Sequence, residues 1–220
     1  IEAINYLNEK KIKSLVIDHH EITKPFPKAN MIINPKKDNG YIEYDYLCAS
    51  TLTYFFLNML ANKIQCKDNL KKYLIYVLLA TVCDVMPIRK LNRLIAINAL
   101  KEFDLSEYNA LNELYKLNKK KNKINIDDRG YLIGPILNSG GRLGKSNYAT
   151  ELLSSENLRD ISQKSIDLVS LNERRKEIET IILKDIDFDK IKNKKEDIIF
   201  YYNSNINEGL LGIIAARLKD

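Results

Sequence analysis

The sequence Leu15-Val16-Ile17-Asp18-His19-His20 places a carboxylate and two imidazoles directly after a short apolar run. Leucine followed by two β-branched residues indicates the end of a buried strand. Open α/β sheets bind their ligands beyond the carboxyl ends of such strands. Imidazole suits Mn, Fe and Zn, and carboxylate suits Mn and Mg. The stretch, which holds the only two histidines of the chain, therefore predicts a metal site, with two solvated histidines in a turn as the alternative.

The direction of the two imidazoles depends on whether the strand continues. If it does, His19 and His20 point to opposite faces, because side chains alternate along a strand. One ring would then bind an ion, and the other would meet a second ion or a substrate phosphate.

A further carboxylate, Asp84, follows the apolar stretch Asn69–Cys83. This stretch is apolar almost all round, which predicts a helix that is buried on most sides. A carboxylate at the end of a buried helix needs a partner, because an unpaired buried charge is costly. A metal ion, a lysine or a backbone cap would each serve.

The composition excludes several classes of protein. With 220 residues and 45% hydrophobic content the chain can bury a real core, and its formal net charge of +6 fits a nucleic-acid partner or simply lysine-rich loops. Cys48, Cys66 and Cys83 lack C-x-x-C spacing, which argues against a disulfide framework or zinc finger and suits a reducing cytosol. No signal peptide or apolar run long enough to span a membrane is visible. Both ends interrupt predicted structure, so we expect an internal piece of a longer protein.

The order of periodic segments predicts an α/β fold, with a parallel sheet flanked by helices. A helix over Ile1–Lys10 leads into a strand at Ser14–Ile17, and Met31–Ile33 is a second short strand. Helices are then predicted over Leu47–Ala61, Asn69–Cys83, Asn92–Phe103, Ile126–Leu137 and Tyr148–Ser154. The highly charged stretch Leu158–Ile186 predicts one long connecting helix, followed by a strand at Asp197–Tyr202 and a helix that opens at Glu208.

The stretch Asn138–Gly144 contains three glycines around Arg142, after a predicted helix with Pro135 near its end. Such a loop would allow close backbone approach, exposed N–H groups and a planar guanidinium for a phosphate. On these residues alone, a plain turn between helices is the favoured interpretation. The glycines after Glu208 lie at a predicted helix N-terminus, where anions bind readily.

Taken together, several stretches in this order resemble the DHH phosphoesterase superfamily, and within it the RecJ single-strand-specific exonucleases. The resemblance spans nearly the whole chain. The matching stretches are Val16–His20, Ile33–Pro35, Ala80–Pro87 with Asn92-Arg93, Ile133–Gly144, Leu171–Arg175 and Glu208–Leu218.

The resemblance implies an architecture and a set of site residues. A partial DHH catalytic domain (1–154) would be joined by a connector helix (155–187) to the start of a DHH-associated, substrate-binding α/β domain (188–220). His19, Asp84 and Asp18 would bind Mn2+ or Mg2+, and Asp18 and His20 would be catalytic, with His20 facing the scissile phosphate. The implied substrate-binding residues are Asn138, Gly140, Gly141, Arg142, Gly209 and Gly212.

The resemblance also implies an activity, namely 5′-to-3′ hydrolysis of single-stranded DNA in repair and recombination. The implied setting is a cytoplasmic monomer without membrane contact that meets a single-strand-binding protein and a helicase. The family's upstream Asp-x-Asp and a further Asp are not in this sequence, so we expect the parent protein to be active and this stretch alone to be inactive.

The sequence departs from the family pattern at three places. Ile136 replaces an arginine, Asn207-Glu208-Gly209 replaces His-x-Gly, and Ala49–Thr51 lacks the expected glycine, so we assign no binding role to that last stretch. Three alternatives remain open. They are a small-substrate DHH phosphodiesterase of the nanoRNase or cyclic-dinucleotide type, a non-catalytic DHH scaffold that binds replication proteins, and a basic nucleic-acid-binding module without chemistry.

Overall fold

The computed structural model describes residues 1–37, 42–101, 103–119, 128–186, 198, 200–203 and 206–219. These residues form two compact units, Ile1–Phe103 and Asp104–Asp220. The predicted fold class is confirmed, because the structure is rich in helices and contains a small parallel sheet. Among the described residues, no helix is both long enough and apolar enough to cross a membrane.

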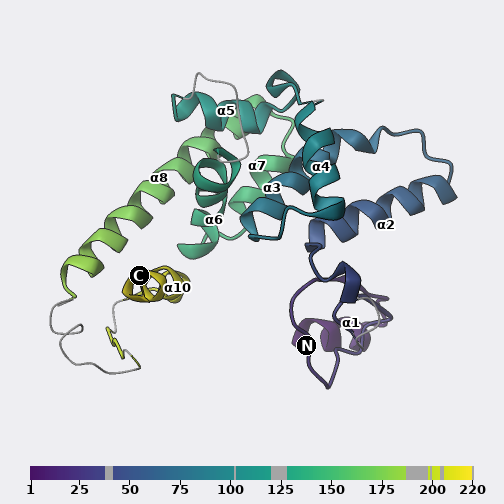
Figure 1. Ribbon diagram of the computed structural model, residues 1–220, viewed down its shortest axis with the longest axis horizontal. Coiled ribbons are helices and arrows are strands. Elements are labelled where there is room, and N and C mark those ends of the chain that lie inside the picture. Colours follow the sequence, from purple (N-terminus) through teal and green to yellow (C-terminus); the bar gives the residue numbers. More distant parts are fainter. Residues whose placement is uncertain are drawn as a thin grey trace. The chain divides into compact units, whose positions relative to one another are not determined.

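The first unit contains the sheet and the helices that follow it. Strands β1 (Leu15–Ile17) and β2 (Met31–Ile33) pair in parallel, with Leu15 opposite Met31 and Ile17 opposite Ile33. The other elements are α1 (Glu2–Glu9), the 3-10 turns η2 (Ile42–Tyr44) and η3 (Leu70–Tyr73), and the helices α2 (Ala49–Lys63), α3 (Leu74–Cys83) and α4 (Lys90–Lys101). Helix α3 packs against both α2 and α4 (Figure 1). Its predicted burial is confirmed, since most of its side chains are buried.

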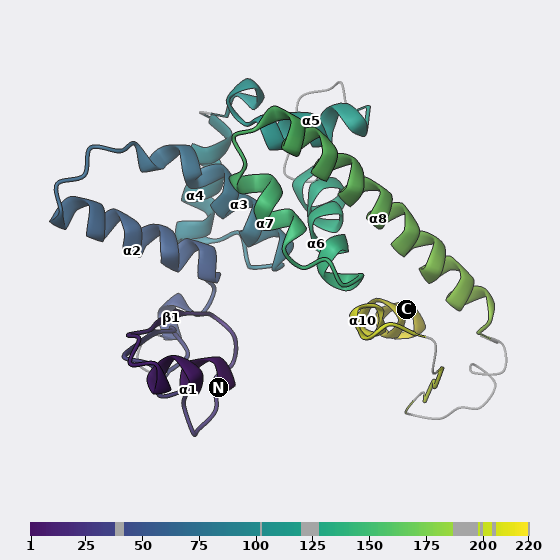
Figure 2. The same cartoon turned by 180° about the vertical axis from the view of Figure 1, so that it is seen from behind.

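The second unit is organised around the long helix α8 (Leu158–Lys184). Its other elements are η4 (Leu105–Glu107), α5 (Asn109–Leu117), a π-helical turn η5 (Asp128–Ile133), α6 (Gly134–Arg142), α7 (Tyr148–Ser154) and α10 (Glu208–Lys219). Helix α8 begins where the Asn157 side chain accepts the N–H groups of Arg159 and Asp160. It packs against α5, α6, α7 and α10 (Figure 2), which confirms a long helix in this region.

The glycine-rich stretch is helical, so the predicted loop over Asn138–Arg142 is wrong. Pro135 lies in the first turn of α6, where a missing N–H breaks no hydrogen bond, and not near its end. The helix ends beyond Arg142, where Gly144 adopts a φ of 82° and the Lys145 N–H donates to the Gly140 carbonyl over 2.6 Å. The backbone N–H groups of Gly140 and Gly141 therefore belong to a helix and are not the exposed donors of a loop.

Other predictions fall wholly or partly on residues that the structure does not describe. Residues 120–127 include the start of the helix predicted from Ile126. Of the strand predicted over Asp197–Tyr202, Asp197 and Ile199 lie outside the described residues, and Phe200–Tyr202 have no strand geometry.

Candidate functional site

The structure brings His19 and Asp84 together in the first unit. His19 lies two residues beyond β1, and Asp84 follows the last residue of α3. The His19 Nε2 atom is 3.7 Å from Asp84 Oδ2, with 12% of the histidine side chain and 43% of the aspartate side chain exposed. Two ligand atoms that each lie about 2.1 Å from one cation are roughly 3–4 Å apart. The pair therefore has the spacing of two ligands of a single ion.

Asp18 and His20 lie close to His19. Among the described residues, Asp18, His19 and His20 form a group whose possible ligand atoms all lie within 4.8 Å of one another. The strand ends at Ile17, so the condition under which the two rings would point to opposite faces is not met. The rings instead lie 4.4 Å apart between centroids at an interplanar angle of 37°.

Asp18 is kept ionised by its neighbours. Burial raises the pKa of this carboxyl group, but hydrogen bonds from the His20 ring and from the backbone N–H groups of His19 and His20 outweigh it, so the net pKa lies below the ordinary value. The His20 Nδ1 atom is 2.7 Å from Asp18 Oδ1. Because an ionised carboxylate only accepts hydrogen bonds, Nδ1 carries a proton, and the lone pair of the neutral His20 ring is on Nε2.

His19 has the opposite tautomer. The backbone N–H of Ala49, at the start of α2, donates to His19 Nδ1 over 3.2 Å, so the proton of the neutral ring is on Nε2, facing Asp84. A cation bound at Nε2 takes the place of this proton, so the neutral ring must then carry its proton on Nδ1, and Nδ1 no longer accepts the Ala49 N–H. Sequence reasoning missed Ala49, because its contribution is a backbone N–H whose position depends on where α2 begins.

A sharp turn leaves Asp84 accessible at the end of α3. Val85 has a φ of 55°, its N–H donates to the Val82 carbonyl, and the Met86 N–H donates to the Thr81 carbonyl over 3.0 Å. These bonds are the Schellman pattern that ends a helix. The assumption that Asp84 is buried is wrong, although its predicted need for a partner is met by His19.

Burial and the adjacent Asp84 charge raise the pKa of Cys83 to about 11, so this thiol is protonated at neutral pH.

A second cluster lies in the other unit, where α6 meets α10. The Arg142 Nη1 atom donates to the Gly209 carbonyl over 2.7 Å. A Cβ atom on Gly209 would lie 2.7 Å from the Arg142 carbonyl oxygen, and one on Gly140 would lie 2.6 Å from the Lys145 carbonyl oxygen. These two glycines are therefore required for close packing of the backbone.

The remaining predicted substrate residues face open space. A Cβ atom on Gly141 or Gly212 would meet no atom within 4 Å. Both glycines and Asn138 are exposed. Of the six residues implied for substrate binding, the structure thus brings Arg142 and Gly209 into contact, gives Gly140 a packing role and leaves the other three at the surface.

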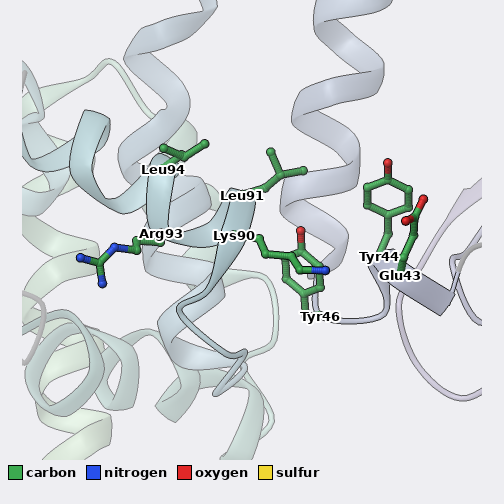
Figure 3. A pocket seen from close by; sticks show the side chains of 7 residues that line it. All are labelled: Glu43, Tyr44, Tyr46, Lys90, Leu91, Arg93 and Leu94. Atoms are coloured by element: carbon green, nitrogen blue, oxygen red, sulfur yellow. The ribbon is translucent and has the colours of Figure 1, made fainter.

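A pocket of about 510 Å³ lies elsewhere in the first unit (Figure 3). Its lining residues are Glu43, Tyr44, Tyr46, Lys90, Leu91, Arg93 and Leu94. The Lys90 ammonium group lies 5.8 Å from the centre of the Tyr46 ring. None of the predicted site residues lines this pocket, so it is not part of the candidate site.

No family model matches the chain, but curated proteins do. The single-stranded-DNA-specific exonuclease RecJ of Haemophilus influenzae is 26% identical over 245 residues, which cover 100% of this chain and 41% of that protein. RecJ of Escherichia coli is 26% identical over 239 residues, with 99% and 41% covered. RecJ of Bacillus subtilis is 26% identical over 208 residues, with 94% and 26% covered. The chain thus spans less than half the length of these relatives.

Solved structures show the same similarity at the level of the fold. RecJ from Thermus thermophilus in complex with Mn2+ has a TM-score of 0.81 at 21% identity, over 98% of this chain and 32% of that chain. An exonuclease RecJ bound to manganese has a TM-score of 0.80 at 20% identity, over 99% of this chain and 54% of that one. The resemblance predicted from the sequence is thereby confirmed, and the chain is similar to RecJ in both sequence and fold.

Proposed function

We propose that this chain is part of a metal-dependent phosphodiesterase that degrades single-stranded DNA from its 5′ end. The convergence of His19 and Asp84, at a separation of 3.7 Å, is the observation that carries the proposal. The relatives reported above are named as single-stranded-DNA-specific exonucleases, which supports this substrate over the small-substrate and non-catalytic alternatives. The manganese held by two solved neighbours supports the choice of cation.

The donor set fits Mn2+ or Mg2+. The two carboxylates of Asp18 and Asp84 suit both ions, and the imidazole of His19 favours Mn2+. Cations held there would lower the pKa of a water molecule and polarise a phosphate. Asp18 holds the His20 ring through Nδ1, so that a protonated His20 can donate from Nε2 to a phosphate oxygen.

The Arg142 cluster would contribute substrate contacts. Gly209 occupies one guanidinium nitrogen, and the guanidinium group has further N–H donors for a phosphate oxygen. Gly141, Gly212 and Asn138 leave an exposed helix surface that a nucleic-acid backbone can approach closely.

The proposal retains the domain boundaries 1–154, 155–187 and 188–220. It also includes cytoplasmic action as a monomer, with a single-strand-binding protein and a helicase as partners.

The test is degradation of 5′-labelled single-stranded DNA by the full-length product of the gene that encodes this chain. Replacing Asp84 by asparagine removes the charge and keeps the shape, so we expect Mn2+-dependent degradation to fall by more than about 100-fold while DNA affinity changes little. Asp68→Asn is the control, because Asp68 is exposed and lies outside the cluster. Undiminished degradation by Asp84→Asn would refute the proposed function.

The 220-residue chain by itself is expected to be inactive in the same assay. Two cations about 3.5–4 Å apart need bridging carboxylates, and the resemblance implies that some of these lie outside this sequence. Degradation of single-stranded DNA by the 220-residue chain with Mn2+ would show that Asp18 and Asp84 suffice.

A further inference from the structure

Three buried polar side chains connect α2 to α3 beside the candidate metal centre. Cys48 precedes the first residue of α2, Thr51 lies in its first turn, and Thr81 lies in the last turn of α3. Cys48 and Thr51 are 0% exposed and Thr81 is 1% exposed. The Cys48 sulfur is 3.4 Å from Thr51 Oγ1 and 3.5 Å from Thr81 Oγ1. We call these three side chains the thiol–hydroxyl chain.

Only one assignment of donors and acceptors satisfies all the hydrogen bonds of the thiol–hydroxyl chain. The Thr81 hydroxyl donates to the Val77 carbonyl over 2.7 Å, so its proton is not available to Cys48. The Cys48 S–H therefore donates to Thr81 Oγ1, and the Thr51 hydroxyl donates to the Cys48 sulfur. Buried polar groups need partners, so this order favours one relative placement of the two helices.

The middle residue and one end of the thiol–hydroxyl chain each lead to a candidate ligand. Cys48, the middle residue, precedes Ala49, whose N–H contacts His19 Nδ1. At the Thr81 end, the Thr81 carbonyl accepts the Met86 N–H in the turn that presents Asp84. The His19 and Asp84 side chains thus lie on segments that are joined through these buried hydrogen bonds.

We propose that Cys48 and Thr81 are positioning residues of the metal centre. They hold the first turn of α2 against the end of α3, and this sets the distance between His19 Nε2 and Asp84 Oδ2. Apolar packing alone allows two helices to shift along each other. The hydrogen bonds of the thiol–hydroxyl chain are directional and fix the position of α2 relative to α3. The proposal rests on the metal-binding role given to His19 and Asp84 under the proposed function.

The test is Mn2+ affinity, measured by titration calorimetry on the full-length product of the gene that encodes this chain. Thr81→Val has nearly the same shape but leaves the Cys48 S–H without its acceptor, so we expect the affinity for Mn2+ to fall about 10-fold. Thr81→Ser keeps the hydroxyl group and should restore the affinity to within about 2-fold. Cys48→Ala should lower the affinity by the same factor as Thr81→Val, and the double variant should lose no more than either single one.

The matched control is Leu78→Ala, which truncates a fully buried side chain of α3 outside the thiol–hydroxyl chain. It should lower the melting temperature without changing Mn2+ affinity, which separates positioning from general stability. Wild-type affinity in Cys48→Ala and in folded Thr81→Val would overturn the positioning role and leave the proposed function standing. Equal loss in Leu78→Ala would also overturn the positioning role. Absence of Mn2+ binding by the unaltered full-length protein would overturn both the positioning role and the metal site.

Discussion

The glycines near Arg142 have different surroundings. Some pack against the backbone of the chain itself, and others face open space. Gly209, in the first turn of α10, lies against the Arg142 backbone, whereas Gly212, one turn later in the same helix, has open space around it. An open glycine within a helix is destabilising relative to alanine, because glycine loses more conformational freedom on folding. No contact within the described part of the chain explains the glycine at position 212.

Alanine substitutions at these two positions should have opposite effects on stability. We expect Gly209→Ala to lower the free energy of unfolding by about 1–3 kcal/mol, because its Cβ overlaps the Arg142 backbone. Gly212→Ala should raise it by about 0.5–1 kcal/mol. Urea denaturation measures the free energy of unfolding of the two variants, whose substitutions lie in the same helix. Equal effects of the two substitutions would rule out this division of roles.

At the scale of single residues, the sequence indicates which side chains could bind a metal better than it indicates which groups lie in contact. Asp18 and His19 could be predicted as ligands because of their chemistry and their place after an apolar strand. The Ala49 N–H and the Cys48 thiol could not, since their contacts depend on the residue at which α2 begins. Gly140 and Gly209 resembled ligand contacts because the sequence does not reveal which backbone segments pack together.

Among the secondary-structure elements, α3 and α6 end in the same kind of turn with different residues. The left-handed position after α6 is Gly144, with a φ of 82°, and the one after α3 is Val85, with a φ of 55°. The left-handed conformation costs about 1–2 kcal/mol for residues with a Cβ atom, and β-branched residues are the most restricted. The end of α3, which presents Asp84, therefore contains local backbone strain.

Relief of this strain should stabilise the chain. We expect Val85→Gly to raise the free energy of unfolding by about 1 kcal/mol, since Val85 is 87% exposed and its side chain contributes little packing. The reciprocal change Gly144→Val should lower it by about 1–2 kcal/mol. Thermal denaturation measures both. A Val85→Gly variant less stable than the unaltered chain would argue against strain at this turn.

Elements with a long, regular pattern were the easiest to predict. The apolar period of the stretch from Leu158 predicted α8 to within two residues of its end at Lys184. The end of α6 was mispredicted, because local glycine content indicates a turn while Gly140 is needed where the helix packs on Leu168. Pro135 likewise suits the start of a helix better than its end.

At the scale of the whole molecule, a buried carboxylate holds α10 against α8 within the second unit. Glu179 is 8% exposed, and it pairs with Arg175 over 2.8 Å and with Arg217 over 3.1 Å. Ile182, Ile186 and Ile214 form a small apolar core beside these ion pairs. Because this core is small, the ion pair between Glu179 and Arg217 should contribute strongly to the attachment of α10, while Arg175 holds the Glu179 carboxylate in place from within α8.

Removal of the Glu179 carboxylate should therefore be costly. We expect Glu179→Ala to lower the free energy of unfolding by about 3 kcal/mol, because Arg175, which is largely buried, loses its partner and α10 loses its ion pair with α8. Glu173→Ala is the matched control on the same helix, where an exposed pair with Lys176 should contribute less than about 1 kcal/mol. Urea denaturation would show the difference, and similar losses in both variants would contradict the assigned role of Glu179.

The long-range meeting of His19 and Asp84 is the part of the molecule least accessible to local sequence patterns. Each residue could be predicted from its own segment, but their contact depends on how α2 packs against both β1 and α3. Only the order of the matching stretches, compared with a known family, indicated it in advance.

The most direct test of the central claim is proton NMR of the imidazole rings during a Mn2+ titration of the 220-residue chain. The chain has only two histidines, so their ring signals can be resolved and assigned with a His20→Gln variant. We expect substoichiometric Mn2+ to broaden the His19 signals, and Asp84→Asn to require a much higher Mn2+ concentration for the same broadening. Sharp His19 signals in excess Mn2+, or equal broadening in Asp84→Asn, would contradict the claim that the two residues share a cation.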